Sequence, residues 1–221
     1  MPNPKKPLPE LINDEVIQGL LLSDGHLTPS YYGIGNSRLE VAQTEKRIDF
    51  LHHLTKYFLS IGLESSLRTC VGWNKQAQKS YSTVYLSTSK NVILSELRKM
   101  WYPNGIKIVP KSLRLTPKNI SYLFMGDGFA NWCNAGLSVD VQLSTNSFTE
   151  TDVRFLAKQL IDNFGISFHV WHKYKKYWIL RTNKNIDTHR FMCLIQPYII
   201  PCFDYKIKHL EKYKNHTNVG I

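Results

Sequence analysis

Acidic residues, long apolar runs and paired cysteines are all scarce in this sequence. Its 17 Asp and Glu stand against 28 Lys and Arg, which leaves a net charge of +11 that both halves of the chain share. The longest apolar run, around residues 19–22, is too short to cross a bilayer. The proline-rich residues 1–9 have no apolar core, so we expect an extended arm there and no signal peptide. A basic surface with 12 Tyr and 5 Trp favours nucleic acid over a membrane as the partner.

Motifs of several common metal sites and nucleases are missing as well. The four cysteines contain no C-x-x-C pair, which favours free, mostly buried thiols over a zinc site or a disulfide. His169 and His172 are three residues apart on a predicted strand, so they point to opposite faces and are not expected to bind one metal ion. No His-Asn-His or GIY-YIG-like pattern occurs, which excludes two other nuclease designs.

Two segments of the chain end in the same way. Residues 15–25 and residues 118–128 are apolar segments that both stop at Asp-Gly. The two acids, Asp24 and Asp127, are 103 residues apart. Either segment alone is weak evidence, but the common ending suggests that one unit occurs twice.

Further landmarks follow in the same order. The spacing of 103 recurs between Gly62 and Gly165, and it falls to 94 between Leu86 and Leu180. We place the nine-residue difference in a hairpin loop, where a change of length has a small entropic cost. The ordered landmarks therefore indicate an internal duplication.

Each copy shows the pattern helix, two strands, helix, two strands, helix. We expect paired helices at about 13–25 and 117–128, 45–60 and 150–163, and 91–101 and 185–195. The expected strands are 26–33, 37–43, 67–73 and 82–87, then 132–138, 139–145, 168–173 and 177–183. The sequence thus predicts an α+β fold of two pseudo-symmetric αββαββα repeats, each with a four-stranded antiparallel sheet. Their boundaries are expected at 1–9 for the arm, 10–110 for the first repeat, and 111–221 for the second repeat with a basic tail.

The ends of the first helix in each copy have recognisable residues. Thr116 followed by Pro117 is a typical N-cap and first helical residue. Gly25 and Gly128, directly after the acids, are expected to end the helices, since glycine is the usual residue at a helix C-terminus.

The acids at these helix ends are electrostatically unfavourable. The negative end of a helix dipole disfavours a nearby carboxylate by roughly 0.3–1 kcal/mol, yet the chain repeats the arrangement. If the two helices packed side by side, Asp24 and Asp127 would converge with the terminal carbonyl groups. Such a concentration of oxygen atoms calls for a hard cation such as Mg²⁺. The alternative is that Asp-Gly is only a turn after a core helix.

These residues resemble a known family. Residues 17–25 and 120–128 look like two degenerate copies of the LAGLIDADG motif, and the chain is similar to single-chain LAGLIDADG homing endonucleases over about residues 10–210. The resemblance implies that the two motif helices form the interface between the halves. It also implies that the two sheets together form a DNA-binding saddle.

The resemblance further implies a metal site. Asp24 and Asp127, helped by the backbone carbonyl groups of Ser23 and Gly126, would hold two or three divalent metal ions, Mg²⁺ in the first place, over the cleavage site. The ions would serve the hydrolysis of DNA.

Four other residues match family positions one at a time. Lys107 and Lys206 stand where related monomers carry basic residues, and either would stabilise charge on the scissile phosphate or hold the attacking water. Plain surface lysines are the alternative. Gln43 and Asn146 would be polar groups close to the metal ions, with simple helix capping as the alternative.

DNA recognition is expected on the outward faces of the sheets and at their hairpin tips. Arg, Gln and Asn can contact base edges in the major groove, whereas Lys mostly contacts phosphate. For any single residue of this set, a solvated strand face is an equal alternative. The candidate DNA-binding residues are Tyr32, Asn36, Arg38, Arg68, Trp73, Lys75, Gln76, Gln78, Lys79, Asn134, Asp140, Gln142, His169, Lys173, Lys175, Lys176, Arg181 and Asn183.

The sequence predicts a monomeric, site-specific double-strand DNA endonuclease that uses Mg²⁺ and leaves staggered ends. Because one chain contains both repeats, we expect a long asymmetric DNA target. The resemblance suggests an intron-encoded protein of an organelle (mitochondrion or chloroplast) or of a microbial cytoplasm. Two rivals use the same fold: an intron maturase that binds intron RNA, and a transcription regulator derived from an inactive nuclease. The two acids favour the nuclease, because a pure RNA-binding protein gains nothing from them.

Overall fold

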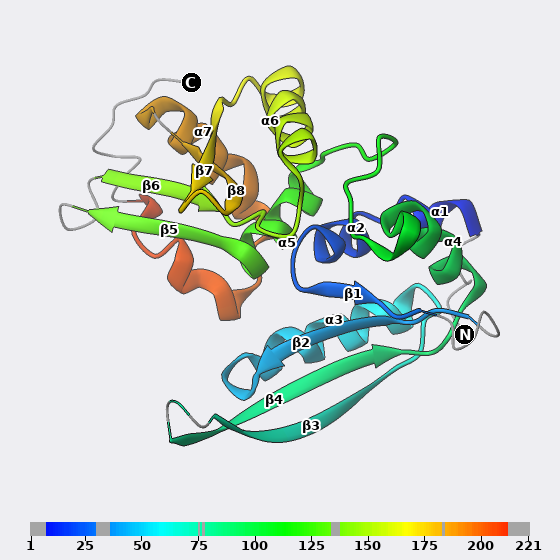
Figure 1. The fold of residues 1–221 in the computed structure, drawn as a ribbon. Coiled ribbons are helices and arrows are strands. Elements are labelled where there is room, and N and C mark those ends of the chain that lie inside the picture. The colour runs from blue at the N-terminus through cyan, green and yellow to red at the C-terminus, as the bar shows by residue number, and fades with distance from the viewer. Residues whose placement is uncertain are drawn as a thin grey trace. The chain divides into compact units, whose positions relative to one another are not determined.

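The computed structural model divides into two compact units between Asn104 and Gly105 (Figure 1). In each unit, helices pack on one face of an antiparallel sheet. No helix within the described ranges is long and apolar enough to span a membrane. The structure describes residues 8–29, 36–74, 76, 78–133, 138–182 and 184–211.

The first unit has four strands in the spatial order β1-β2-β4-β3. Its short first helix was not expected, because the prolines before it predicted an extended arm; residues 1–7 of that arm lie outside the described residues. The elements are α1 (Leu8–Ile12), α2 (Glu15–Leu22), β1 (Gly25–Leu27), β2 (Leu39–Thr44), the 3-10 helix η1 (Glu45–Arg47), α3 (Ile48–Ser60), β3 (Ser65–Asn74), β4 (Lys79–Thr88), α4 (Val92–Trp101) and the 3-10 helix η2 (Pro103–Gly105).

The second unit repeats this arrangement with the strand order β5-β6-β8-β7. The two orders correspond strand by strand, so the predicted α+β fold with two pseudo-symmetric repeats is confirmed. The elements are α5 (Pro117–Asp127), β5 (Gly128–Cys133), β6 (Ser138–Leu143), α6 (Glu150–Phe164), β7 (Phe168–Lys173), β8 (Tyr177–Thr182), α7 (Asn185–Ile195) and the 3-10 helices η4 (Gln196–Tyr198) and η5 (Pro201–Lys206).

Strand register defines which residues of the two units are equivalent. Gly25 lies opposite Val41, and Gly128 lies opposite Leu143. The two glycines are 103 residues apart, but their partners are 102 apart. The spacing of 103 therefore fails by one residue along β2 and β6, where the apolar residues Leu39 and Val41 are already one residue out of phase with that spacing in the sequence.

The hairpin of the first unit is extended along its strands. β3 and β4 have 10 residues each, whereas β7 and β8 have 6 each. Most of the nine-residue difference is therefore in paired strands, and its predicted place in the loop is wrong. A hairpin can lengthen in this way without changing the rest of the sheet, because matched residues added to both strands continue the same hydrogen-bonded ladder.

Two helices of the second unit, α5 and α6, begin at threonines that cap them. The Thr116 side chain accepts a hydrogen bond from the backbone N–H of Asn119, whose side chain accepts one from the backbone of Thr116. Pro117 follows as the first helical residue, as predicted. Thr149 forms the same reciprocal pair with Asp152 at the start of α6. These caps satisfy backbone donors that have no partner inside the helix.

Gly128 is the C-cap of α5, as predicted, whereas α2 ends at Leu22, before Gly25, and neither glycine is left-handed. Gly128 is extended, with φ −86° and ψ 151°. A Cβ atom on Gly128 would lie 2.4 Å from the carbonyl oxygen of Phe124, and one on Gly25 would lie 2.7 Å from that of Leu20. Glycine is needed because each strand starts directly against the last turn of its helix. Left-handed glycine ends α6 instead, at Gly165.

The cysteines are less buried than expected. Cys70, Cys193 and Cys202 form no disulfide, and each is half-buried. The side chain of Cys133 lies outside the described part of the chain.

Replacing Gly128 with alanine should lower the free energy of unfolding by about 1–3 kcal/mol, the usual cost of forcing extra volume into a packed site. The added Cβ would meet the backbone of Phe124. Urea denaturation would measure the change. Gly72→Ala is the matched control, because nothing lies within 4 Å of a Cβ at that position. Equal stabilities of the two variants would contradict the close contact between helix and strand.

Candidate functional site

The first candidate acid follows a helix that is buried on all sides. Asp14 caps α2 by accepting hydrogen bonds from the backbone N–H groups of Val16 and Ile17, each at 3.1 Å. Every residue from Val16 to Leu22 is buried. Asp24 is half-buried just beyond the helix end. An apolar helix of this kind is held by its surroundings, so it gives the acid a fixed position.

The Asp24 carboxylate has a direct partner on β2. Gln43 donates a hydrogen bond from Nε2 to Asp24 Oδ2 at 2.5 Å, and its side chain is only 6% exposed. Arg47 in turn donates from Nη1 to Gln43 Oε1 at 3.4 Å. This contact brings together two predicted site residues, Asp24 and Gln43. The amide holds one carboxylate oxygen, which sets the direction of the other.

The contact of Arg47 with Gln43 was not predicted from the sequence. It lies four residues after Gln43, across the junction between β2 and the short helix η1. The available signal was this spacing, since residues four apart face each other once the chain becomes helical. The junction was instead expected to begin a regular helix at residue 45.

The second candidate acid ends α5. Residues Asn119 to Met125 are buried, while Gly126 and Asp127 are half-buried. The backbone carbonyl of Asp127 accepts a hydrogen bond from the backbone N–H of Ser144 at 2.9 Å. The acid is therefore tied to the segment that follows β6 through its backbone.

Lys206 lies at the same helix end. It is only 9% exposed, and its Nζ donates hydrogen bonds to the carbonyl oxygens of Phe124 at 2.9 Å, Met125 at 2.7 Å and Gly128 at 2.7 Å. An ammonium group has three protons, so three carbonyl groups engage all of them. These carbonyls flank Asp127 on both sides along the chain.

The positive charge of Lys206 also offsets the unfavourable electrostatics at this helix end. A cation at the C-terminus offsets the negative end of the helix dipole, which otherwise disfavours the Asp127 carboxylate. The family resemblance predicts that the ammonium group faces a phosphate or a water molecule. In this structure it caps the helix instead, because the terminal carbonyls of α5 are the nearest strong acceptors.

In the first unit, different groups stabilise the end of α2 and the acid that follows it. Ser23 Oγ donates to the carbonyl oxygen of Gly19 at 3.1 Å, and Gln43 contacts the carboxylate of Asp24 itself. The two acids have equivalent places in the fold, but one is supported through its side chain and the other through the backbone around it. The repeats therefore share geometry and differ in chemistry.

Gln43 and Asn146 are 103 residues apart, which makes them equivalent by the spacing of the two acids, but strand register does not place them at equivalent positions. With Val41 equivalent to Leu143, the counterpart of Gln43 is Thr145. Thr145 is buried and donates from Oγ1 to the carbonyl oxygen of Trp178 at 2.8 Å. Asn146 is exposed in the turn after β6. Because the offset along β2 and β6 is 102 and not 103, the spacing of the acids selects Asn146 in place of Thr145 as the counterpart of Gln43.

Lys107 belongs to the second unit. Its Nζ lies 5.6 Å from the ring centroid of Phe148, a cation–π contact with the segment before α6. The lysine is half-buried. This contact involves neither Asp24 nor Asp127, so a role of Lys107 in the candidate site stays a prediction.

The oxygen atoms at both helix ends suit a hard cation. No group of three or more His, Cys, Asp or Glu side chains that could hold a metal occurs among the described residues. Mg²⁺ commonly takes only one or two protein carboxylates and completes its shell with water and substrate phosphate. One acid in each unit, with the carbonyl groups of Ser23 and Gly126 in the same turns, therefore fits Mg²⁺ better than a cation that needs a full protein cage.

The outward face of the first sheet carries several predicted DNA contacts. Arg68 lies opposite Tyr85, with its guanidinium 5.6 Å from the ring centroid. Trp73 was assigned to the same face, which is wrong. Because side chains alternate along the regular ladder, Trp73 shares the helix-bearing face with Val71. Asn36, Gln76, Gln78 and Lys79 are exposed.

In the second sheet, the register places the predicted strand residues together. His169 lies opposite Arg181, and Arg181 lies opposite Gln142. Asp140 and Lys173 share this face by alternation, and His172 points to the other face, as expected. Lys175 and Lys176 are exposed at the hairpin tip. The candidates outside the described residues are Tyr32, Lys75, Asn134 and Asn183.

A model of the LAGLIDADG DNA endonuclease family matches residues 14–188, which is most of the chain. The chain belongs to this family. The matched region starts at the residue that caps α2, and it includes both helix ends that carry the acids.

Three related proteins match most of the chain. An uncharacterized protein of Methanocaldococcus jannaschii is 31% identical over 90% of this chain and 74% of its own. The cytochrome b mRNA maturase bI2 of Debaryomyces hansenii is 25% identical over 87% of this chain and 72% of its own. The DNA endonuclease I-ChuI of Chlamydomonas applanata is 23% identical over 87% and 93%.

The fold is also that of a solved homing endonuclease. The structure of I-WcaI bound to its DNA recognition sequence matches with a TM-score of 0.76 at 22% identity, over 89% of this chain and 85% of that chain. At this identity the likeness concerns the fold. It agrees with the paired four-stranded sheets found here.

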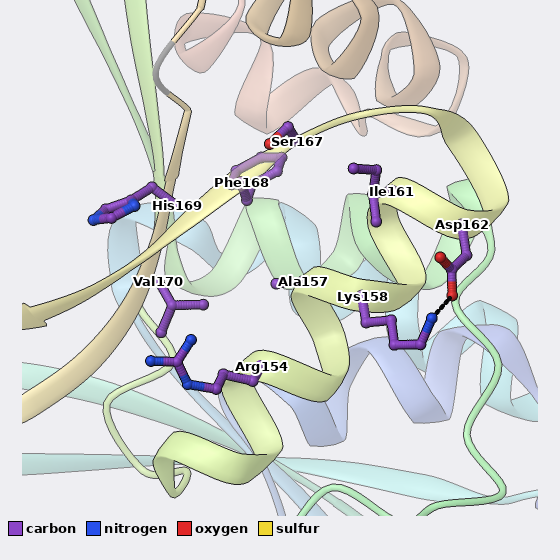
Figure 2. Close-up of a pocket in the computed structure, with 9 residues that line it drawn as sticks. All are labelled: Arg154, Ala157, Lys158, Ile161, Asp162, Ser167, Phe168, His169 and Val170. Carbon is purple, nitrogen blue, oxygen red and sulfur yellow. Dashed lines mark hydrogen bonds and ion pairs between the residues drawn. The ribbon is translucent and has the colours of Figure 1, made fainter.

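The second unit of this family member also has a cavity between α6 and β7 (Figure 2). Its volume is about 470 Å³, and its basic residues Arg154 and Lys158 are paired with Glu150 and Asp162. Neither Asp127 nor Lys206 lines it. The cavity is therefore separate from the candidate acid of this unit.

Lys206→Met should lower the free energy of unfolding by at least about 1–3 kcal/mol, the cost of one unsatisfied buried acceptor. The variant would leave three carbonyl groups at the end of α5 without their donor. Lys208→Met is the control, since Lys208 is exposed two residues away. Urea denaturation would compare both with the parent chain. A loss no larger than that of the control would rule out the capping role.

Proposed function

We propose that this protein is a site-specific double-strand DNA endonuclease of the homing type, dependent on Mg²⁺. The observation that carries the proposal is the repeated helix end: a fixed, half-buried aspartate follows a buried motif helix in each unit. Membership of the LAGLIDADG DNA endonuclease family supports it. A related protein of similar length is named as a DNA endonuclease.

In this proposal the acids and their neighbours have defined parts. Asp24 and Asp127, with the carbonyl groups of Ser23 and Gly126, would hold Mg²⁺. When bound, the ion supplies a Lewis acid for the phosphate and lowers the pKa of an attacking water. Gln43 orients the Asp24 carboxylate.

The two units would each contact one half of the DNA target. The outward sheet faces carry basic and amide side chains that suit phosphate and base edges. The faces differ, since the first hairpin is longer and Ser87 takes the place of Arg181. We therefore propose a long asymmetric target, cut on both strands with staggered ends by a single chain.

A second function has a specific observation in its favour. The chain is 25% identical to a protein named as a cytochrome b mRNA maturase. An intron maturase would use a basic surface to bind intron RNA and help splicing. Stimulated splicing of a host intron by the purified protein would support this function, with or without DNA cleavage. An intron-encoded origin, in an organelle or a microbe, stays a prediction.

Cleavage itself can be tested without knowing the target. The protein would be incubated with a randomised duplex library in Mg²⁺, and the cut ends would be captured and sequenced. We expect one family of long, non-palindromic sites with a constant stagger. Absence of any enriched cut site would refute the endonuclease assignment.

Asp24→Asn and Asp127→Asn should each lower cleavage by more than about 100-fold, because even residues that only support metal ligands contribute 10- to 100-fold. DNA affinity measured without Mg²⁺ should stay close to that of the parent, since the sheet faces are unchanged. Asp162→Asn is the matched control: this exposed acid pairs with Lys158 on α6. Full cleavage by either site variant would remove that acid from the metal site.

A single chain should bind each duplex. Both acids are in one polypeptide, so a second copy supplies nothing that is missing. Light scattering should give a mass near 25.7 kDa for the free protein and one chain in the DNA complex. Two chains per duplex, or a palindromic preferred site, would contradict the division of work between the units.

A further inference from the structure

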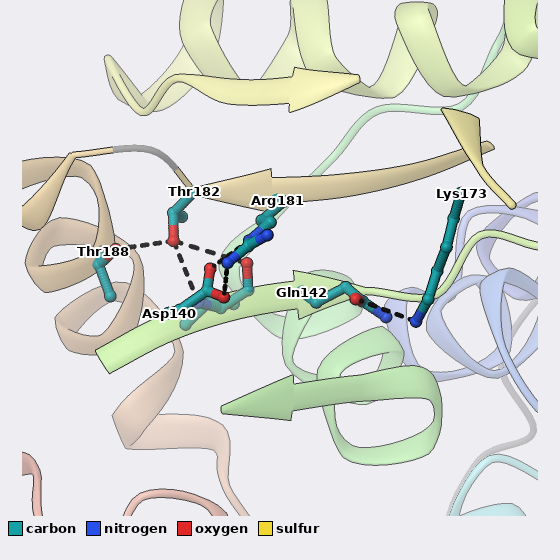
Figure 3. Close-up of polar contacts among 7 residues, drawn as sticks. Asp140, Gln142, Lys173, Arg181, Thr182 and Thr188 are labelled. Atoms are coloured by element: carbon teal, nitrogen blue, oxygen red, sulfur yellow. Dashed lines mark hydrogen bonds and ion pairs between the residues drawn. The ribbon is translucent and has the colours of Figure 1, made fainter. Parts of the chain in front are cut away.

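Arg181 is held from one side by Asp140 on the outward face of the second sheet (Figure 3). Arg181 Nε donates to Asp140 Oδ1 at 2.9 Å, and Nη2 lies 2.6 Å from Oδ2. The two contacts are parallel, so this is a bidentate pair between the strands β8 and β6. Such a pair fixes the plane of the guanidinium as well as its position.

A third residue restricts the same side chain. The guanidinium carbon of Arg181 lies 5.3 Å from the ring centroid of Trp171 on β7. The side chains of Arg181 and Asp140 remain 42% and 29% exposed. Ion pairs at such exposed positions contribute little to folding stability. The arrangement orders an arginine at the surface, which is useful for binding a partner.

The free edge of the guanidinium identifies the chemistry of that partner. Asp140 takes the edge formed by Nε and Nη2, which leaves the end formed by Nη1 and the second Nη2 proton pointing away from it. Two parallel donors on a rigid fork match the O6 and N7 acceptors of guanine in the major groove. Both oxygens of Asp140 are engaged by Arg181, so the acid acts through the arginine.

The first unit contains the same type of pair in a different place. By strand register, Arg38 is equivalent to Asp140, and Ser87 is equivalent to Arg181. Arg38 Nη2 lies 2.7 Å from Glu40 Oε1, which also accepts a hydrogen bond from Ser87 Oγ at 3.2 Å. The arginine thus occupies the acid's position. The two arginines are therefore at non-equivalent positions of their sheets: Arg38 directly precedes β2, and Arg181 lies on β8.

We propose that Asp140 is a positioning residue that makes Arg181 specific for one guanine in the half-site bound by the second unit. Glu40 positions Arg38 over a base pair at a different place in the other half-site. The inference rests on the proposed DNA-binding function and adds a determinant of sequence preference. The acids also place negative charge beside the DNA, which weakens binding to sequences that lack the guanine.

The test is a binding selection that does not depend on cleavage. The complete protein would select duplexes from a randomised library in Ca²⁺, and base preferences would be compared among the parent, Asp140→Asn, Arg181→Ala and the double variant. We expect Asp140→Asn to lose preference for guanine at a single base pair by roughly 5- to 150-fold, the range for one bidentate contact. The double variant should lose no more than Arg181→Ala alone, because Asp140 acts through Arg181.

Three controls separate this role from others. Glu40→Gln should change the base preference at a different base pair, and Asp162→Asn should leave the preference at every base pair unchanged. Asp140→Glu keeps the charge and should retain part of the preference, while thermal unfolding checks that every variant is folded. An Asp140→Asn variant with the parent's preferences, or a double variant that loses a second base pair, would overturn the inference alone. A parent chain that selects no duplex would refute the proposed function together with it.

Discussion

The contact between the last turn of each motif helix and the first residue of the following strand constrains the rest of the site. Gly25 and Gly128 let the strand start against the backbone of Leu20 and Phe124, where any Cβ would clash. The acid immediately before each glycine is therefore fixed at the junction between a buried helix and the edge of a sheet. Its depth is set by the scaffold, and its carboxylate remains partly accessible.

This position has an electrostatic cost, because a carboxylate follows the negative end of a helix. The two units meet that cost with different residues. Lys206 neutralises the end of α5 through three carbonyl groups, whereas Gln43 gives Asp24 a direct hydrogen bond and connects it to Arg47. The duplicated scaffold was conserved between the repeats, while the side chains that support each acid diverged.

The sheets show the same division between scaffold and surface. Their buried faces keep equivalent positions, such as Val41 and Leu143, and their strand orders correspond. Their outward faces carry transposed arginine–carboxylate pairs, and one hairpin is longer by paired residues. An exposed face can change in this way because it is not part of the core. It is therefore the part of each repeat that is free to acquire a distinct DNA preference.

The sequence by itself determined the α+β class, the duplication, the helix start at Thr116, and the place of the two acids at helix ends. Caps, periodicity and spacing are local properties, so they survive without a structure. Tertiary structure decided the face of Trp73, the partner of Gln43 and the contacts of Lys206. The first two depend on strand register, in which a shift of one residue reverses a face or a neighbour. The third joins atoms about 80 residues apart, and only packing of the complete unit brings them together.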